Sequence, residues 1–270
     1  SVVIIHGSPD GYTPANSPLY SQKNVSDILN EFDYVVYLSK ANFKSWTKKL
    51  VSNSNHFIIS NSIEEDEVQS ILNYDKNYYY SSLNFKEDNF NVVIPGSVIY
   101  VKGQDLIINN IEKILALIPN IHIHFIGGIR GEWATNLLDY VMNSKYINCM
   151  TFHGFVNNSL EFIYAADLIL LPSRAEGQPL AVLEAMALGK VVVTTNYEGI
   201  EEVIDNEKSG FIIDLDNFDD LILDVLYQIY TNNEQKALIE SEAKIKYIKD
   251  FSIAKQKEKI IILINEITRN

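Results

Sequence analysis

Cysteine and long apolar runs are the two features that this sequence most clearly lacks. Its 270 residues contain a single cysteine, Cys149, so no disulfide can form within the chain. No apolar run approaches the roughly 20 residues that a membrane-spanning helix needs, and the opening segment SVVIIH is too short for the core of a signal peptide. We therefore expect a cytoplasmic protein that does not span a membrane, with the inner face of the membrane as an alternative location.

A surplus of positive charge is lacking as well. Lys and Arg number 22 against 35 Asp and Glu, which gives a formal net charge of −13. This argues against a nucleic-acid-binding surface spread over the protein, because such surfaces need a surplus of Lys and Arg. One segment differs, since Lys40, Lys44 and Lys48 recur every four residues and share a helical face. That face is either an ordinary solvated surface or a peripheral contact with an anionic membrane.

Short apolar runs alternate with helix-like segments along the chain. The predicted strands are SVVIIH, DYVVYLS, HFIIS, NVVIPG, IHIHFIGG, DLILLPS, KVVVTT and GFIIDL. Strands that are apolar on both faces and alternate with helices are typical of a parallel sheet covered on both sides, so the sequence predicts an α/β protein. Residues 64–90 interrupt the pattern because they are acidic, rich in tyrosine and without a clear period. They are predicted to form an inter-domain connection.

Residues 171–196, LPSRAEGQPLAVLEAMALGKVVVTTN, join a buried strand to a helix through a short loop. Pro179 is predicted at the first helical position, and Gly189 just past the helix end. Such loops lie at the carboxyl ends of parallel strands, where doubly wound proteins bind ligands. The free N–H groups at the helix start favour an anion, so this loop is a predicted phosphate site.

Two carboxylates flank the predicted anion. Glu176 lies in the loop and Glu184 in the helix, eight positions further on. Neither can face a phosphate without repulsion, so each should lie to one side of it, where hydroxyl groups are good partners. At about 1.5 Å per residue, Glu184 is roughly 7 Å along the helix from Pro179, about one ribose away. The spacing suits a nucleotide sugar, with Glu176 on the sugar and Glu184 on the ribose.

Residues 172–204, PSRAEGQPLAVLEAMALGKVVVTTNYEGIEEVI, resemble the signature of retaining glycosyltransferases of the GT-B fold, in particular glycosyltransferase family 4. The shared features are a Pro-Ser pair, a Glu-Gly pair, the tetrapeptide Glu-Ala-Met-Ala, a glycine and a strand. The similarity covers about residues 91–251, and the segments before it resemble the last part of the family's acceptor domain. The resemblance implies a GT-B type fold with a complete C-terminal Rossmann-like donor domain and a partial N-terminal Rossmann-like acceptor domain.

Four parts of the chain follow from this resemblance. Residues 1–63 are predicted to form the partial acceptor-side domain, 64–90 the connection, 91–250 the donor-binding domain, and 251–270 a helix that packs back on the N-terminal part. Because an apolar strand already begins at residue 2, we expect further acceptor-side units in a longer chain or a partner subunit. The chain would then bind a donor nucleotide but transfer little sugar by itself. Its strand edge at residues 2–5 would favour self-association.

The resemblance also implies roles for single residues. Lys102 matches the second member of a basic pair on the donor diphosphate, while Ser97 stands where the family usually has Arg. His6 matches a histidine that reaches across the cleft to the donor sugar. The implied catalytic residues are Glu176, Lys102 and His6. The implied donor-binding residues are Ser97, Lys102, Gly128, Phe155, Val156, Glu176, Gly177, Gln178, Pro179, Leu180 and Glu184.

Several of these assignments concern the backbone. The amides of Gln178 and Leu180 are expected near the diphosphate, and the main chain at Phe155 and Val156 near the base. Gly127 and Gly128 are expected to leave room for the nucleotide. No metal site is predicted, because His122 and His124 share a strand face without a third ligand and are expected to pack in the core.

The implied reaction is transfer of a hexosyl group from a nucleotide diphosphate sugar to a glycan, lipid-linked or protein acceptor, with retention of configuration and no required cofactor. A UDP-sugar is expected ahead of a GDP-sugar, and bacterial-type surface polysaccharide or glycoconjugate synthesis is the expected setting. One alternative is a donor-binding subunit that is inactive without a partner acceptor domain. Another is a retaining glycosidase that uses Glu176 and Glu184 as an acid and nucleophile pair. The sequence does not identify the base, the sugar, the acceptor or the linkage.

Overall fold

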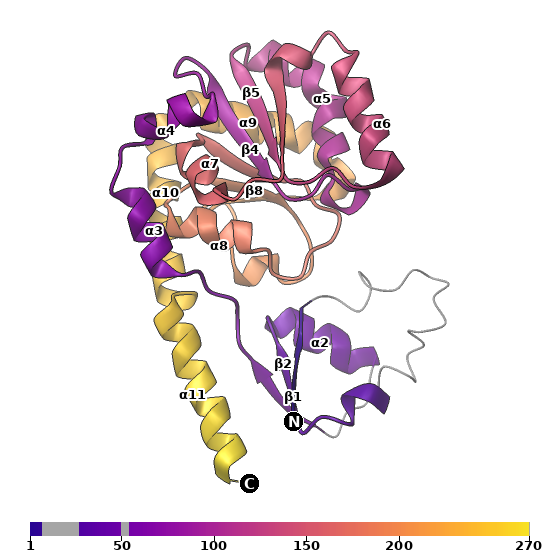
Figure 1. Cartoon of the computed structure of the whole chain (residues 1–270), viewed down its shortest axis with the longest axis vertical. Coiled ribbons are helices and arrows are strands. Elements are labelled where there is room, and N and C mark those ends of the chain that lie inside the picture. Colours follow the sequence, from indigo (N-terminus) through magenta and orange to yellow (C-terminus); the bar gives the residue numbers. More distant parts are fainter. Residues whose placement is uncertain (7–26, 50–53, 270) are drawn as a thin grey trace.

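The computed structural model describes residues 1–6, 27–49 and 54–269, and it shows two lobes (Figure 1). The smaller lobe contains a parallel sheet of order β1-β2-β3, formed by β1 (Val2–Ile5), β2 (Tyr34–Tyr37) and β3 (Asn55–Ile58). Helix α2 (Lys40–Lys49) covers one face of this sheet, because Phe43 and Trp46 pack against the cluster of Ile5, Val35 and Tyr37. The three lysines of α2 predicted to share a face are exposed.

The larger lobe contains a second parallel sheet, of order β6-β5-β4-β7-β8-β9. Its strands are β4 (Phe90–Pro95), β5 (Ile121–Ile126), β6 (Met150–Gly154), β7 (Leu168–Leu171), β8 (Val192–Thr195) and β9 (Phe211–Ile213). Alternate residues face opposite sides, so that Val92 lies in one apolar cluster and Val93 in the other. Two buried faces explain why the strands are almost continuously apolar, and the α/β prediction is confirmed.

Helices cover both faces of the larger sheet. One face carries α5 (Gln104–Leu117), α6 (Gly131–Met142) and α9 (Phe218–Thr231), and the other carries α7 (Ser159–Ala165), α8 (Leu180–Ala187) and α10 (Asn233–Asp250). Four short 3-10 helices lie between these elements: η2 (Tyr100–Lys102), η3 (Ile147–Cys149), η4 (Ile200–Glu202) and η5 (Leu215–Asn217). No helix within the described ranges is both long and apolar enough to cross a bilayer.

The structure differs from the sequence expectation in two places. Residues 64–90 contain two helices, α3 (Glu65–Leu72) and α4 (Lys76–Leu83), whose buried side chains belong to the core of the larger lobe. The helical period of this segment is weak in the sequence, because acidic residues and tyrosines dominate it. Tyr79 and Tyr80 carry polar hydroxyls, yet both side chains are buried. The segment MTFHG forms strand β6, which the apolar runs did not indicate since Thr and His interrupt it.

The chain crosses between the lobes twice, and the two crossings are hydrogen-bonded to each other. The first follows β3, and the second joins α10 to α11 (Ile253–Arg269). Gln256 of α11 donates from Nε2 to the carbonyl oxygen of Ser60 (2.9 Å) and accepts from the hydroxyl of Ser62 (2.9 Å). Tyr247 of α10 donates to the carbonyl oxygen of Ile63 (3.4 Å). The two crossings therefore form one paired connection.

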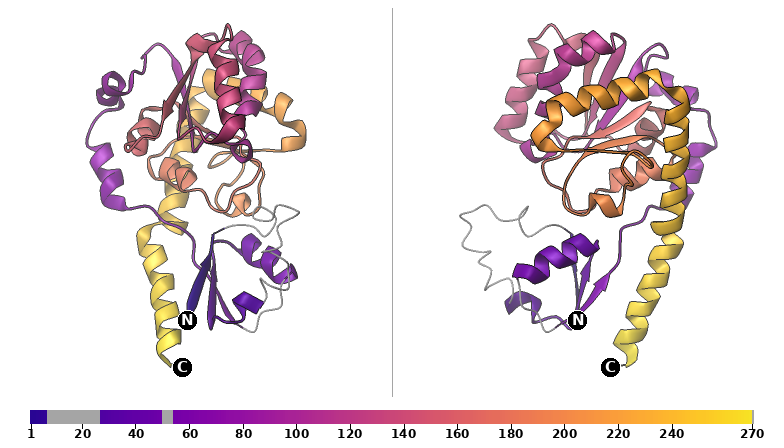
Figure 2. Two further views of the ribbon diagram at one scale, coloured as in Figure 1. Left: turned by 45° about the vertical axis from the view of Figure 1, so that its right-hand side comes forward. Right: turned by 180° about the vertical axis from the view of Figure 1, so that it is seen from behind.

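Helix α11 runs back along the smaller lobe, so that the two ends of the chain lie close together (Figure 2). Its Leu263 is only 8% exposed and packs in a cluster with Tyr34, Val36 and Ile59 of the smaller lobe. Ile261 on the same helix is 57% exposed. Leu263 is thus the side chain through which the last helix stabilises the smaller sheet.

We predict that Leu263→Ala destabilises the smaller lobe by about 2–3 kcal/mol, because truncating a buried leucine loses apolar burial and leaves a cavity. Ile261→Ala on the same helix is the matched control and should change stability by less than about 0.5 kcal/mol. Amide hydrogen exchange in β2 and β3 measures the effect. Equal protection of these strands in both variants would show that α11 does not support the sheet.

Candidate functional site

Strands β4 and β7 are neighbours in the larger sheet, although α5, β5, α6, β6 and α7 lie between them in the chain. The helix α5 that follows β4 lies on one face of the sheet, and the helix α8 that follows β7 lies on the other. The chain therefore leaves these two strand ends toward opposite faces of the sheet, and we call the space outside the two strand ends the β4–β7 crevice. Open parallel sheets bind ligands at such a point, where the direction of the winding reverses.

Arg174 clamps the two loops together. Its guanidinium donates to both carboxylate oxygens of Asp105 (2.9 and 2.7 Å) and to the carbonyl oxygen of Tyr100 (2.6 Å), and it lies 4.0 Å from the centre of the Tyr100 ring. Gly103 allows this close approach, because a Cβ there would lie 1.9 Å from the carbonyl oxygen of Pro172. No sequence pattern indicated a role for Arg174 or Asp105. Only the fold reveals them, since 69 residues separate the pair.

The clamp brings Lys102 against Glu176. The Nζ atom of Lys102 lies 2.5 Å from Oε1 of Glu176, and the hydroxyl of Ser173 donates to the same oxygen (2.7 Å). The side chains are 25% and 10% exposed, respectively. The pair combines a charge that suits a phosphate with a carboxylate that suits sugar hydroxyls. From the sequence, Lys102 was expected on the diphosphate of the ligand and Glu176 on its sugar. In the structure the two side chains contact each other directly.

Helix α8 points its first turn into the same crevice. It begins at Leu180, with the extended Pro179 as the preceding cap residue, so the prediction that Pro179 occupies the first helical position is wrong by one residue. No side chain caps the amides of this first turn. These amides and the helix dipole favour an anion beside Lys102. Gly177 lies two residues before Pro179 in the loop.

Glu184 lies on the second turn of α8 and is partly buried. Burial raises the pKa of this carboxyl above its ordinary value, and the negative charge of Glu67 on α3 adds to the rise. The protein surroundings of Glu184 therefore disfavour its ionised form. Hydroxyl groups that donate to Glu184 would offset this cost, because hydrogen bonds to the charged form of an acid stabilise it.

Gln178 has a contact that the sequence did not indicate. Its side-chain Oε1 accepts from the backbone N–H of Asn61 (2.6 Å), and its carbonyl oxygen accepts from Nδ2 of Asn61 (3.0 Å). Gln178 is 8% exposed. Asn61 belongs to the first crossing between the lobes, so the loop that carries Glu176 is tied directly to that crossing.

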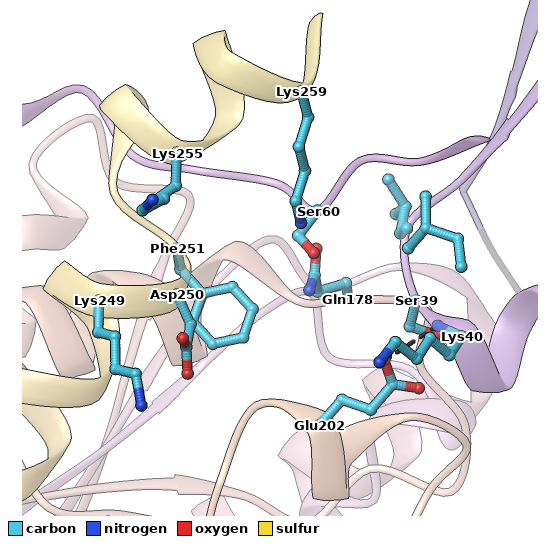
Figure 3. Close-up of a pocket in the computed structure, with 12 residues that line it drawn as sticks. Ser39, Lys40, Ser60, Gln178, Glu202, Lys249, Asp250, Phe251, Lys255 and Lys259 are labelled. Carbon is cyan, nitrogen blue, oxygen red and sulfur yellow. Dashed lines mark hydrogen bonds between the residues drawn. The ribbon is translucent and has the colours of Figure 1, made fainter. Parts of the chain in front are cut away.

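A second tie between the lobes involves Glu202 of η4. Its carboxylate accepts from the backbone N–H groups of Lys40 (2.9 Å) and Ala41 (2.6 Å) at the start of α2, as Figure 3 shows for Lys40. Gly199 approaches Ser39 so closely that a Cβ would lie 2.8 Å from its hydroxyl oxygen. The segments that follow β2 and β8 therefore contact each other directly, where the two lobes meet.

Tyr197 is a buried neighbour of Glu176 that sequence reasoning missed. Its side chain is 7% exposed. Burial raises the pKa of Tyr197, and the negative charge of Glu176 raises it further. The Tyr197 hydroxyl therefore stays undissociated, within electrostatic reach of the carboxylate that the sequence places on a sugar.

The remaining predicted residues lie around this crevice in different settings. Ser97 is partly buried, and its carbonyl oxygen accepts from Gln104 (3.1 Å). Phe155, directly after β6, is 77% exposed, while Val156 packs against the core. His6 is exposed and directly follows β1, whose carboxyl end faces the larger lobe (Figures 1 and 2).

The two predicted glycines have different surroundings. Gly127 has a φ of +154°, and a Cβ there would lie 2.1 Å from the carbonyl oxygen of Gly96. Its lack of a side chain is thus required by the approach of the β4 and β5 loops, and the room expected there for a nucleotide stays a prediction. A Cβ at Gly128 would meet only the Arg130 side chain, at 3.8 Å. Gly128 is therefore the glycine that borders open space.

His124 of β5 and His153 of β6 form an uncharged network in the larger lobe. Nδ1 of His124 lies 3.0 Å from Nε2 of His153, and Nε2 of His124 lies 3.1 Å from Oδ1 of Asn91. Since an amide oxygen only accepts, His124 donates to Asn91 and accepts from His153. Burial lowers the pKa of His124 to about 2, which keeps it uncharged. Within the described ranges, no group of three or more His, Cys, Asp or Glu residues could hold a metal ion.

Comparison with known proteins identifies several relatives. A family model described as Glycosyl transferases group 1 matches residues 75–245. The UDP-Gal:alpha-D-GlcNAc-diphosphoundecaprenol alpha-1,3-galactosyltransferase of Escherichia coli is 32% identical over 107 residues, which are 40% of this chain and 27% of that protein. The O-antigen biosynthesis glycosyltransferase WclY of Escherichia coli is 29% identical over 175 residues, or 64% of this chain and 46% of that protein. The chain thus spans less than half the length of these relatives.

The solved structure of HepE from Anabaena, in complex with UDP and glucose, has a similar fold. The TM-score is 0.84 at 19% sequence identity, and the match covers 98% of this chain and 71% of HepE. The family match and this likeness confirm the GT-B type architecture predicted from the sequence.

We predict that Gly127→Ala destabilises the larger lobe by about 2–4 kcal/mol, because the added methyl group collides with the backbone of Gly96 and the positive φ is unfavourable for alanine. Gly128→Ala is the matched control and should leave the free energy of unfolding within about 0.5 kcal/mol of the wild type. Urea titration measures both. A Gly127→Ala chain as stable as the Gly128→Ala chain would contradict the close approach of the two loops.

Proposed function

Because the chain belongs to the glycosyl transferases group 1 family, we propose that it transfers a hexosyl group from a nucleotide diphosphate sugar to a glycan, lipid-linked or protein acceptor. One observation carries the proposal: Lys102, after β4, contacts Glu176 in the loop after β7, and helix α8, which carries Glu184, begins four residues after Glu176. An anion site flanked by two hydroxyl-binding carboxylates fits a molecule with sugars on both sides of a diphosphate.

Each part of the donor has a proposed partner. The diphosphate lies between Lys102 and the first amides of α8, the ribose donates hydrogen bonds to Glu184, and the transferred sugar lies beside Glu176. A UDP-sugar is the proposed donor, supported by the UDP and glucose bound to HepE, with a GDP-sugar as the alternative. His6, Ser97, Gly128, Phe155 and Val156 keep their proposed places around this ligand, and no cofactor is proposed.

The proposed chemistry is electrostatic. The bond between the anomeric carbon and the donor phosphate oxygen breaks, the acceptor oxygen bonds to that carbon, and the proton of the acceptor hydroxyl passes to the departing diphosphate. The departing diphosphate gains negative charge, which Lys102 and the α8 N-terminus would stabilise in place before the reaction begins. Lys102 at the same time holds Glu176 toward the sugar. We propose retention of configuration, as the sequence resemblance implies.

The proposed setting is the synthesis of bacterial-type surface polysaccharides or glycoconjugates. Support comes from the names of the two Escherichia coli relatives, one acting in O-antigen biosynthesis and the other on a lipid-linked sugar diphosphate. Peripheral membrane contact through Lys40, Lys44 and Lys48 and self-association stay predictions. A donor-binding subunit that needs a partner acceptor domain is the alternative, because the matched relatives are longer than this chain.

The function is tested by calorimetric binding of UDP, GDP and uridine, followed by release of UDP from UDP-sugars with and without added acceptor glycans. We expect UDP to bind more tightly than uridine. A donor-binding subunit would bind UDP without acceptor-stimulated release. A chain that binds neither nucleotide but hydrolyses an aryl glycoside would instead be the retaining glycosidase.

We predict that Lys102→Ala weakens UDP binding by about 10–100-fold, the loss for a hydrogen bond to a charged group, and weakens uridine binding far less. The reason is that uridine has no phosphate for Lys102 to contact. Lys113→Ala, on the exposed face of α5, is the matched control and should bind both ligands normally. Equal losses for UDP and uridine in Lys102→Ala would mean that the substitution distorts the crevice and removes no phosphate contact.

We predict that uridine binds more tightly as the pH rises from about 4.5, the ordinary pKa of glutamate, toward neutrality. Burial and the charge of Glu67 raise the pKa of Glu184 in the free protein, whereas ribose hydroxyls would donate to its ionised form and lower that pKa. Binding therefore releases a proton between the two pKa values, so affinity increases with pH there and is constant above. Calorimetry across this range measures the slope.

Glu184→Gln should bind uridine more weakly by about 1.5–3 kcal/mol near neutral pH and without this slope. Glu67→Gln is the control, because removing the second negative charge should move the slope to lower pH and leave the affinity at neutral pH unchanged. Identical pH profiles for the wild type and Glu184→Gln would exclude Glu184 from the ribose site.

A further inference from the structure

A second basic site lies outside the donor crevice, in a cavity of about 480 Å³ between the lobes (Figure 3). Its walls come from the carboxyl ends of β2 and β3, from Gln178 in the loop after β7, from η4, and from the junction of α10 and α11. Four lysines line it: Lys40, Lys249, Lys255 and Lys259. Four lysines around one cavity are unexpected in a chain with a net charge of −13.

The two carboxylates that also line the cavity are already engaged. Glu202 accepts the two backbone amides at the start of α2, and Asp250 lies 3.6 Å from Nζ of Lys246. Lys255 pairs with Glu258 (3.0 Å) on its own helix, but Lys40, Lys249 and Lys259 have no side-chain ion pair with any described residue. The cavity lining therefore carries more positive than negative charge, with four lysines against two carboxylates. An anion with more than one negative charge is the ligand that such a surface favours.

Lys259 is the most enclosed of the four lysines, since it is partly buried and the others are exposed. It extends from α11 toward Ser60, which lies next to Gln178 (Figure 3). Lys40 enters from the opposite wall, at the start of α2. A hydroxyl group and a carboxamide thus lie between two lysines from different elements, and both can hydrogen-bond to phosphate oxygens.

The distance between the cavity and the proposed donor site indicates which substrate carries the anion. Gln178 follows Glu176 by two residues, and two residues of chain span at most about 7 Å. An anion beside Gln178 is thus about one monosaccharide away from the sugar proposed at Glu176. It is distinct from the donor diphosphate, which is proposed at Lys102 and the α8 N-terminus. The carboxyl ends of β2 and β3 in the smaller lobe line the same cavity.

We propose that this cavity binds the phosphate or diphosphate group of the acceptor, so that the acceptor is a sugar carrying that group directly on its ring, with Lys259 and Lys40 as the principal contacts. The proposal rests on the proposed function, because it takes the β4–β7 crevice as the donor site. It predicts two anion sites in one chain, on either side of the loop from Ser173 to Gln178.

Calorimetric titration of inorganic pyrophosphate into the full chain, with the donor site saturated by UDP, tests the second site. We expect Lys259→Ala and Lys40→Ala each to weaken this binding by about tenfold while UDP binds as in the wild type. Lys257→Ala, an exposed lysine of α11 that does not line the cavity, is the matched control and should have no effect. Wild-type affinity in Lys259→Ala, or an equal loss in Lys257→Ala, would overturn the site.

A second titration with glucose 1-phosphate and inorganic phosphate separates an acceptor from a free ion. Tighter binding of glucose 1-phosphate, lost in Lys259→Ala, supports the acceptor assignment. Equal affinity for the two probes would overturn it in favour of a free phosphate site. Failure of the proposed function is seen separately, as absence of UDP binding in a wild-type chain whose pyrophosphate binding still depends on Lys259.

Discussion

The contact between Lys102 and Glu176 is the interaction on which the arrangement of the crevice depends. Two opposite charges lie 2.5 Å apart with little exposure to water, so removing either would leave the other unpaired in a poorly solvated place. The pair exists only because Arg174 and Gly103 bring the β4 and β7 loops together. An anionic ligand that approaches Lys102 also alters the charge felt by Glu176. Phosphate binding and sugar binding are thus electrostatically coupled through one lysine.

The loop that carries Glu176 is held from both lobes. Ser173 and Glu176 are bonded within the larger lobe, whereas Gln178 is bonded to Asn61 at the crossing between the lobes. A change in the angle between the lobes must therefore move or break the contacts of Gln178, which lies two residues from Glu176. The arrangement explains how a site built on one lobe can respond to what the other lobe binds.

Much of the fold follows from patterns in the sequence, whereas much of the site does not. The apolar runs located the strands well, because a parallel sheet with two buried faces demands them, and β6 was missed because His153 and Thr151 replace apolar residues there. Glu176, Glu184 and Lys102 were identifiable because they lie in or near a recognisable strand–loop–helix segment. Arg174, Asn61 and Tyr197 were not, since their roles arise from contacts over long sequence distances. Gly127 was recognised as special, but its reason is a backbone approach that no sequence pattern records.

The paired crossing between the lobes has a mechanical consequence. A single connecting segment would leave the two lobes free to rotate about several axes relative to each other. Two crossings that are hydrogen-bonded to each other at Ser60, Ser62 and Ile63 instead restrain twisting and favour rotation about one axis. Opening and closing about that axis changes the width of the space between the lobes while keeping the facing residues in register. The chain can therefore admit and release bulky molecules without losing the alignment of its two halves.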